Sequence, residues 1–155
     1  MVILSMAFFL LSAPIIPCSQ CENIADYLEL ELVYWQDTVN FGENVKIDVV
    51  FKNTTGHELS FYPKSIIFLA KPMAGFEFNS LFLNRALDVA KRKDIGPGMV
   101  YSETYEIGIT EDFFSKGPNV LILGYTCKKL KGKLKKHNTL CGNLVTEESI
   151  LFITR

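Results

Sequence analysis

Residues 41–55 carry the pattern that decides the fold class: Phe41-Gly42-Glu43-Asn44-Val45-Lys46-Ile47-Asp48-Val49-Val50-Phe51-Lys52-Asn53-Thr54-Thr55. From Val45 to Lys52, apolar side chains fall on every second residue, and the residues between them are mostly charged. Side chains point alternately to the two faces of a strand, so this period of two predicts a strand with one buried face. Turn-forming residues lie at 40–44 before it and at 53–56 after it. The stretch is therefore predicted to be a half-buried strand between two turns.

Further strands are predicted outward from this one in both directions. Residues 28–34 alternate in the same way on the N-terminal side. On the C-terminal side, strands are predicted over 59–69, 76–82, 99–109 and 120–125, followed by a last strand that Cys141 opens and whose apolar part is Ile150 to Ile153. Pro63 is predicted to bend or interrupt the first of these, because proline cannot donate to a sheet ladder. A short helical or irregular piece is predicted after 82, and Thr110 is predicted to cap one helical turn that Gly117-Pro118 ends.

The whole chain is predicted to be a single all-β domain after its first 21 residues. Its 155 residues are 48% hydrophobic, which suits one domain with a full core. About seven short strands at regular spacing, with one brief helical turn, predict an antiparallel β-sandwich. No strand–helix–strand alternation and no internal repeat competes with this interpretation, so residues 22–155 are assigned to the sandwich.

Three stretches resemble immunoglobulin-like modules of bacterial secreted proteins. Residues 41–55 resemble their "G-E-x-V-x-I-x-V-x-x-x-N" strand, and Ile95-Gly96-Pro97-Gly98 resembles their "L-x-P-G" turn. Residues 117–125 are similar to their penultimate strand, "P-G-x-Y-x-V-x-A-x-Y", with Asn119-Val120 in place of the usual glycine and tyrosine. The likeness runs over about residues 26–153 and implies an Ig-like sandwich with a binding or scaffolding role. It implies no catalytic residue.

Residues 1–21 have the character of an export signal. They contain no charged side chain, and residues 2–11 are largely apolar, which is shorter than the ~20 residues of a spanning helix. Small residues at Ser19 and Cys21 favour cleavage before Glu22, although the usual basic start is absent. We therefore expect a periplasmic, secreted or cell-surface protein. A retained N-terminal anchor, a buried strand, and lipid attachment at Cys18 are the alternatives, and Pro17 and Ile15 disfavour the last.

Two cysteines remain once such a leader is removed. Cys127 and Cys141 form a lone pair, and in an oxidising compartment a lone pair predicts a disulfide. Between them lies the lysine segment, residues 128–136, which reads Lys128-Lys129-Leu130-Lys131-Gly132-Lys133-Leu134-Lys135-Lys136. A basic loop closed by a disulfide is predicted to be a presented surface.

The charge distribution indicates what such a surface could bind. The six lysines of the segment belong to sixteen Lys and Arg in all, and the other ten face seventeen acids, so the remainder carries a net charge of −7. Nucleic-acid binders spread basic charge over a whole face or groove, so no nucleic-acid partner is expected. A partner protein with an acidic surface fits best. An anionic membrane surface, or a segment that only maintains solubility, is the alternative.

Signals for catalysis, metals and cofactors are weak. His57 and His137 are the only histidines, and neither belongs to a metal-spaced set, so no metal or other cofactor is expected. Tyr34, Trp35, Tyr101 and Tyr105 could form a sugar-binding platform, but filling of the sandwich core accounts for them. Asn53-Thr54-Thr55 is an N-glycosylation sequon on a predicted turn, with meaning only in a eukaryotic secretory route.

The sequence thus favours an exported, non-enzymatic binding module. Its sharper version is an inhibitor or immunity-type protein that presents the basic loop to an acidic site. An accessory domain of an enzyme and a surface adhesion component are the alternatives.

Overall fold

The strand predicted over residues 45–52 is β4 (Asn44–Asn53), the central strand of a three-stranded antiparallel sheet. β2 (Leu28–Tyr34) pairs with one of its edges and β9 (Val100–Gly108) with the other. The predicted alternation is confirmed, since Val45, Ile47, Val49 and Phe51 are all fully buried. The buried face forms because every second side chain is apolar, and burial of apolar surface is the main force that stabilises the fold.

A larger sheet is built around β10 (Gly117–Cys127). One edge of β10 pairs with β6 (Ile66–Pro72), which pairs in turn with β7 (Asn79–Phe82). The other edge pairs with two strands in succession, first β12 (Ser149–Thr154) and then β11 (Leu140–Val145). β3 (Thr38–Asn40) adds to β12 and β1 (Glu22–Asn23) adds to β11, both in parallel.

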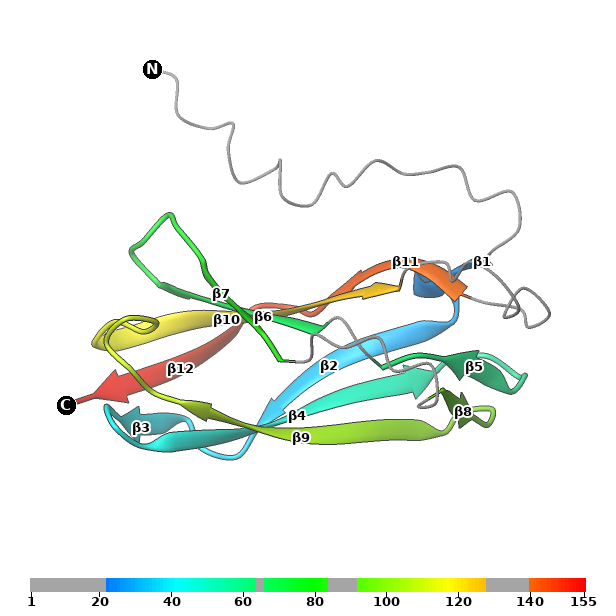
Figure 1. The fold of residues 1–155 in the computed structure, drawn as a ribbon, viewed down its shortest axis with the longest axis horizontal. Helices are drawn as coiled ribbons and strands as arrows, with labels where there is room; N and C mark the ends of the chain where they lie inside the picture. Colours follow the sequence, from blue (N-terminus) through cyan, green and yellow to red (C-terminus); the bar gives the residue numbers. More distant parts are fainter. Residues whose placement is uncertain (1–21, 64–65, 84–91, 128–139) are drawn as a thin grey trace, which may run out of the picture.

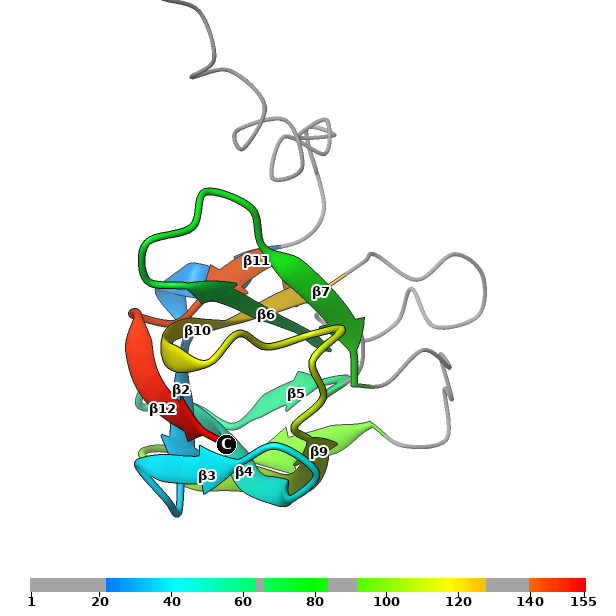
Figure 2. The same ribbon diagram turned by 90° about the vertical axis from the view of Figure 1, so that its left-hand side faces the viewer.

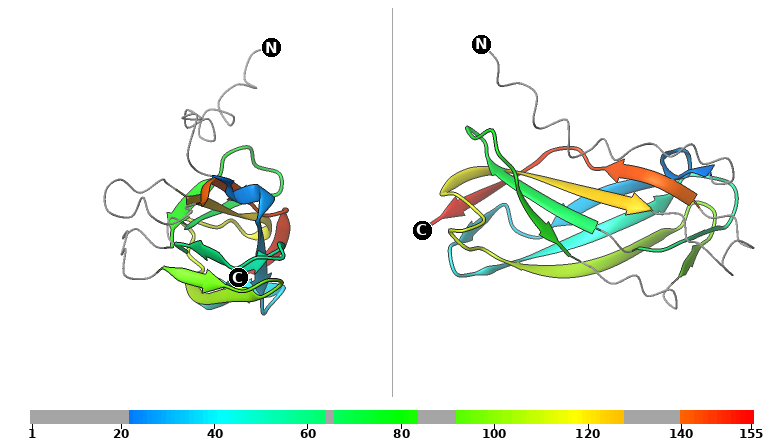
Figure 3. Two further views of the ribbon diagram at one scale, coloured as in Figure 1. Left: turned by 90° about the vertical axis from the view of Figure 1, so that its right-hand side faces the viewer. Right: turned by 45° about the horizontal axis from the view of Figure 1, so that its top comes forward.

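The two sheets face each other as the layers of a sandwich (Figure 1). Figure 2, which looks along the strands, places β6, β7, β10 and β11 above β4 and β9. Leu121, Leu123 and Tyr125 of β10 meet Phe51 of β4 in one core, and Tyr125 and Phe51 stack edge to face with ring centroids 5.1 Å apart. A two-stranded sheet of β5 (Leu59–Phe61) and β8 (Lys93–Ile95) lies at the end opposite the C-terminus (Figure 3).

The computed structural model describes residues 22–63, 66–83, 92–127 and 140–155. Within these ranges, no helix is long and apolar enough to cross a membrane. The all-β sandwich predicted from the sequence is confirmed.

Several details differ from the sequence-based expectation. Cys141 does not open a single last strand, because residues 146–148 separate β11 from β12. Residues Gly117 and Pro118 begin β10 instead of ending a helix, and residues after Thr110 form a turn in which the Phe114 N–H donates to the Thr110 carbonyl oxygen at 2.9 Å. The helical turn among the described residues is instead a 3-10 helix, η1 (Ile24–Asp26). The sheets also contain two parallel pairs, which period-two patterning cannot distinguish from antiparallel ones.

Candidate functional site

The lysine segment belongs to the connection between β10 and β11. These strands pair antiparallel from Gly124 and Val145 to Cys127 and Gly142, and residues 128–139 join them beyond that point. The six predicted binding lysines, Lys128, Lys129, Lys131, Lys133, Lys135 and Lys136, lie outside the described residues, as does His137. The structure therefore shows the two strands between which the segment starts and finishes.

The two cysteines lie at the ends of these strands. The backbone register sets Cys127 opposite Gly142, so Cys141 is one residue out of register with it. Cys141 also pairs in parallel with Asn23 of β1. The side chains of both cysteines lie outside the described part of the structure, so the disulfide stays a prediction. Mass spectrometry of the exported protein checks it, with two free thiols as the contradicting result.

The strand ends that flank the lysine segment in the sequence are firmly packed. Tyr125 is 1% exposed, and its hydroxyl donates a hydrogen bond to the Tyr62 carbonyl oxygen. Leu140 and Leu144 of β11 are also buried. Aromatic and apolar burial of this kind holds both strands to the core, so the segment begins and ends on rigid structure.

β1 and η1 complete this end of the sandwich, which we call the segment base: Asn23, Ile24, Tyr125, Leu140 and Gly142. Asn23 caps η1, because its Oδ1 accepts a hydrogen bond from the Ala25 N–H at 3.3 Å. Gly142 has a φ of 120°, and a Cβ at this position would lie 2.8 Å from Asn23 Oδ1. Only glycine combines that backbone conformation with so close an approach. Residues 1–21 join the fold at the same place, since Glu22 pairs with Leu140.

A second polar cluster lies on the inner face of β9, and the sequence reasoning did not single it out. The Tyr101 hydroxyl donates to Glu103 Oε1, and the Tyr105 hydroxyl donates to Oε2 at 2.6 Å. Desolvation, and then the hydrogen bond to Glu103, raise the pKa of Tyr101 above its ordinary value. The sequence does contain a signal for this cluster. A glutamate has one tyrosine two residues before it and another two residues after it, on an otherwise apolar strand face. The Glu103 carboxylate thus accepts a hydrogen bond from a tyrosine on either side, which ties three side chains of β9 together.

The proposed sugar-binding platform does not assemble. Tyr34, Tyr101 and Tyr105 pack against the hydrophobic core, as the core-filling interpretation predicted. Ile47 of β4 also lies between Tyr34 of β2 and Tyr105 of β9 in the sheet. Trp35 is 71% exposed at the end of β2 and does not share that inner face.

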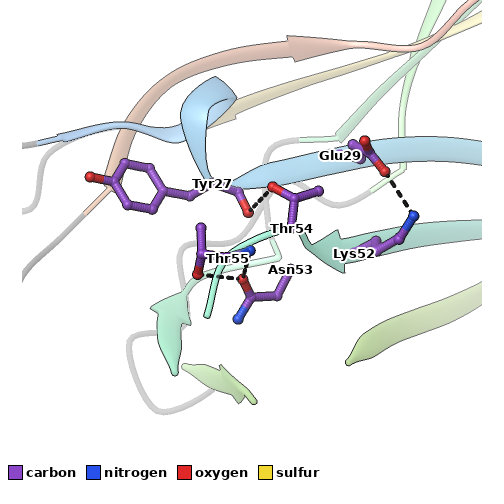
Figure 4. A network of polar contacts seen from close by, with 6 residues as sticks. All are labelled: Tyr27, Glu29, Lys52, Asn53, Thr54 and Thr55. Atoms are coloured by element: carbon purple, nitrogen blue, oxygen red, sulfur yellow. Dashed lines mark hydrogen bonds and ion pairs between the residues drawn. The ribbon is translucent and has the colours of Figure 1, made fainter. Parts of the chain in front are cut away.

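The turn after β4 is a polar network centred on Asn53 (Figure 4). Asn53 is fully buried, and its Nδ2 donates to the carbonyl oxygens of His57, Ile95 and Gly96 at 2.7, 3.0 and 3.0 Å. Its Oδ1 accepts from both the N–H and the hydroxyl of Thr55. In the folded chain the sequon nitrogen is thus enclosed by protein.

Candidate catalytic groups remain dispersed. His57 is exposed in the turn, and Glu29 forms an exposed ion pair with Lys52 at 3.2 Å. Across the described ranges, no three His, Cys, Asp or Glu residues gather as a metal site would require.

Comparison with known proteins adds information on the fold alone. No family model matches the sequence, and no curated protein is similar to it. Among solved structures, the sporulation control protein Spo0M of Bacillus subtilis is similar with a TM-score of 0.52 at 10% identity, over 83% of this chain and 50% of that one.

Two further similar structures have lower TM-scores. A CARDB domain from Pyrococcus furiosus has a TM-score of 0.41 at 13% identity, over 82% of this chain and 87% of that one. The alkylpurine DNA glycosylase AlkC of Pseudomonas fluorescens has a TM-score of 0.48 at 12% identity, over 83% of this chain and 31% of that one. The chain thus spans half or less of Spo0M and AlkC, and the Spo0M likeness shows a shared sandwich architecture.

Proposed function

We propose that this chain is an exported, non-enzymatic binding module of Ig-like fold that presents its lysine segment to an acidic surface on a partner protein. The observation that supports this most is the pairing of β10 with β11 as far as Cys127 and Gly142. It brings both ends of the connection that contains the lysines to neighbouring strands. The sharper form of the proposal is an inhibitor or immunity-type protein whose segment enters an acidic cleft.

The charge asymmetry of the chain gives the segment a steering role. Six positive charges in nine residues belong to a protein whose remainder sums to −7. An approaching acidic partner is attracted by the segment and repelled by the body, so encounters in the productive orientation are favoured.

The packing of the segment base offsets the electrostatic repulsion among these lysines. Lysines within a Debye length of ~8 Å repel one another and favour an open chain. Burial of Tyr125, Leu140 and Leu144 holds the two strand ends together. The predicted disulfide would add ~3 kcal/mol by closing a loop of ~15 residues.

An anionic membrane surface is a second candidate partner, favoured by one separate observation. β1 pairs with β11, so the uncharged residues 1–21 join the fold beside the strand that follows the lysine segment. An anchor retained there would hold the segment near lipid, where each lysine contributes ~1 kcal/mol of attraction to anionic headgroups.

Two charge-matched variants test the proposal. The segment variant replaces Lys129, Lys131, Lys133 and Lys135 with Gln. The body variant replaces Lys46, Lys52, Lys93 and Lys116 with Gln and changes the net charge equally. Binding of the full chain is measured to a synthetic poly-glutamate peptide, and to phosphatidylserine vesicles with phosphatidylcholine vesicles as the uncharged control.

We expect poly-glutamate binding that weakens steeply with salt and is lost in the segment variant but retained in the body variant. If the chain binds phosphatidylserine vesicles but not poly-glutamate, and the segment variant loses that binding, the partner is a membrane surface and not a protein. Equal loss in both variants would show that net charge alone matters and would overturn the proposal.

A further inference from the structure

The outer faces of the two sheets differ sharply in chemistry. On the β2–β4–β9 sheet, the outward side chains include the ion pairs Lys52–Glu29 and Lys46–Glu106, and Thr104 donates to Asp48 at 2.5 Å. This face is a solvated surface, since its charges are exposed and mutually paired.

The outer face of the β10-centred sheet is apolar. The register sets Ile122 opposite Leu69, Gly124 opposite both Ile67 and Val145, and Ile67 opposite Phe82, so these side chains share the face turned away from the core. Ile150 joins them opposite Val120. We call this set the apolar outer face: Ile67, Leu69, Phe82, Ile122, Val145 and Ile150. Phe82 is 46% exposed and Val145 51% exposed.

A projecting arm extends this apolar surface. The connection between β6 and β7 rises from the sheet on the side away from β2, β4 and β9 (Figures 1 and 2). It carries Met73, which is 52% exposed, and Phe76, which is 93% exposed. A phenylalanine this exposed contributes nothing to the folding of the isolated domain and is typical of an anchor side chain in an interface.

From these observations we propose that the apolar outer face and its arm form a two-fold interface with a second copy of this chain. Phe152 faces outward on β12 two residues after Ile150. Phe76, Phe82 and Phe152 alone expose on the order of 300–450 Å² at ~150–250 Å² per aromatic side chain. With the aliphatic side chains around them, the area approaches the ~800 Å² per partner of a standard stable interface. Two β-sheet faces of this chemistry pack against each other as the two layers of the sandwich do.

Charge determines which face of the second copy is bound. Packing against the outer face of the other sheet would bury the Lys52–Glu29 and Lys46–Glu106 pairs at a large desolvation cost. The matching surface is therefore the same apolar outer face, and such an isologous contact closes as a dimer instead of continuing into a fibre.

The one ionisable residue among these paired outward positions of β6 is compatible with this arrangement. Lys71 follows Leu69 by two residues on β6, and its Nζ lies 4.9 Å from the ring centroid of Phe78. A two-fold axis near Leu69 and Ile122 would place the Cα atoms of the two copies of Lys71 about 14 Å apart, given ~3.4 Å per residue. Each Lys71 ammonium keeps its own Phe78 ring as a partner, so the contact does not bring the two positive charges together.

The test is sedimentation equilibrium of the full chain over a wide range of concentration. We expect a dimer whose dissociation constant rises roughly 30-fold or more in Ile150→Glu, as for loss of a central interface residue. Val33→Glu is the matched control, because Val33 is 39% exposed on the other sheet and Ile150 is 37% exposed. High salt should leave the dimer intact, which separates it from association through the lysine segment.

Thermal denaturation confirms that each variant is folded, and Phe82→Glu provides the same test from β7 if Ile150→Glu does not fold. A wild-type chain that is monomeric at every concentration would overturn the proposal, and so would equal weakening by Val33→Glu.

Discussion

Asn53 shows how much of the fold depends on one buried amide. The sequence pattern marked it as a turn residue and as the first residue of a sequon, and both interpretations place such a side chain near solvent. In the structure it is fully buried and joins the end of β4 to the turn at 55–57 and to the end of β8. Composition and spacing cannot reveal this, because the carbonyl partners at 95 and 96 are distant in sequence.

We expect Asn53→Ala to lower the free energy of unfolding by about 2–4 kcal/mol, because it leaves buried carbonyl groups without a donor. Urea denaturation measures the change. The exposed Asn44→Ala is the control and should stay within about 0.5 kcal/mol of the wild type. A change in Asn53→Ala no larger than that of the control would show that the turn does not need the amide.

Tyr101 gives the stability a dependence on alkaline pH. Its pKa in the folded chain is raised above the unfolded value of ~10, so the folded state favours the protonated phenol. This contribution is fully present below pH ~10 and is lost as the pH rises above it. Stability should therefore fall less steeply above pH ~10 in Tyr101→Phe than in the wild type, as urea denaturation at several pH values would measure. Parallel profiles in the two proteins would contradict the assignment.

At the scale of elements, alternation predicted the long strands and missed the short strands β1 and β3. β2, β4 and β9 were predicted because seven to ten residues of period-two pattern leave little ambiguity. β1 and β3 have two and three residues, too few for a period to show. Their parallel pairing also depends on where β11 and β12 lie, which is tertiary information.

A substitution at Gly142 tests how tightly β1 and β11 pack in the segment base. In Gly142→Ala the new Cβ would meet Asn23 Oδ1 in a backbone conformation that side chains rarely adopt. We expect a loss of about 1–3 kcal/mol in the free energy of unfolding. Gly56→Ala, where no atom lies within 4 Å of the new Cβ, should be nearly neutral. If both substitutions had the same effect, the close contact between β1 and β11 would be unsupported.

At the scale of the whole molecule, one outer face is charged, the other is apolar, and the lysine segment adds a third, basic group of side chains. The sequence predicted the basic one, because a run of lysines is visible without a structure. The apolar outer face was missed, because its residues come from five strands that only the sheet order brings together. A local pattern says that one face of a strand is buried but cannot say what covers the other.

The most direct measurement of the central claim is the association rate of the full chain with poly-glutamate, by stopped-flow fluorescence at low salt. Steering by the lysine segment predicts that the segment variant associates about 10-fold or more slowly than the wild type, with a smaller change in the dissociation rate. The body variant, with the same net charge, should associate within about 3-fold of the wild-type rate, because its lysines lie outside the segment. Equal slowing in both variants, or no slowing in either, would contradict the account and leave the segment as ordinary solvated surface.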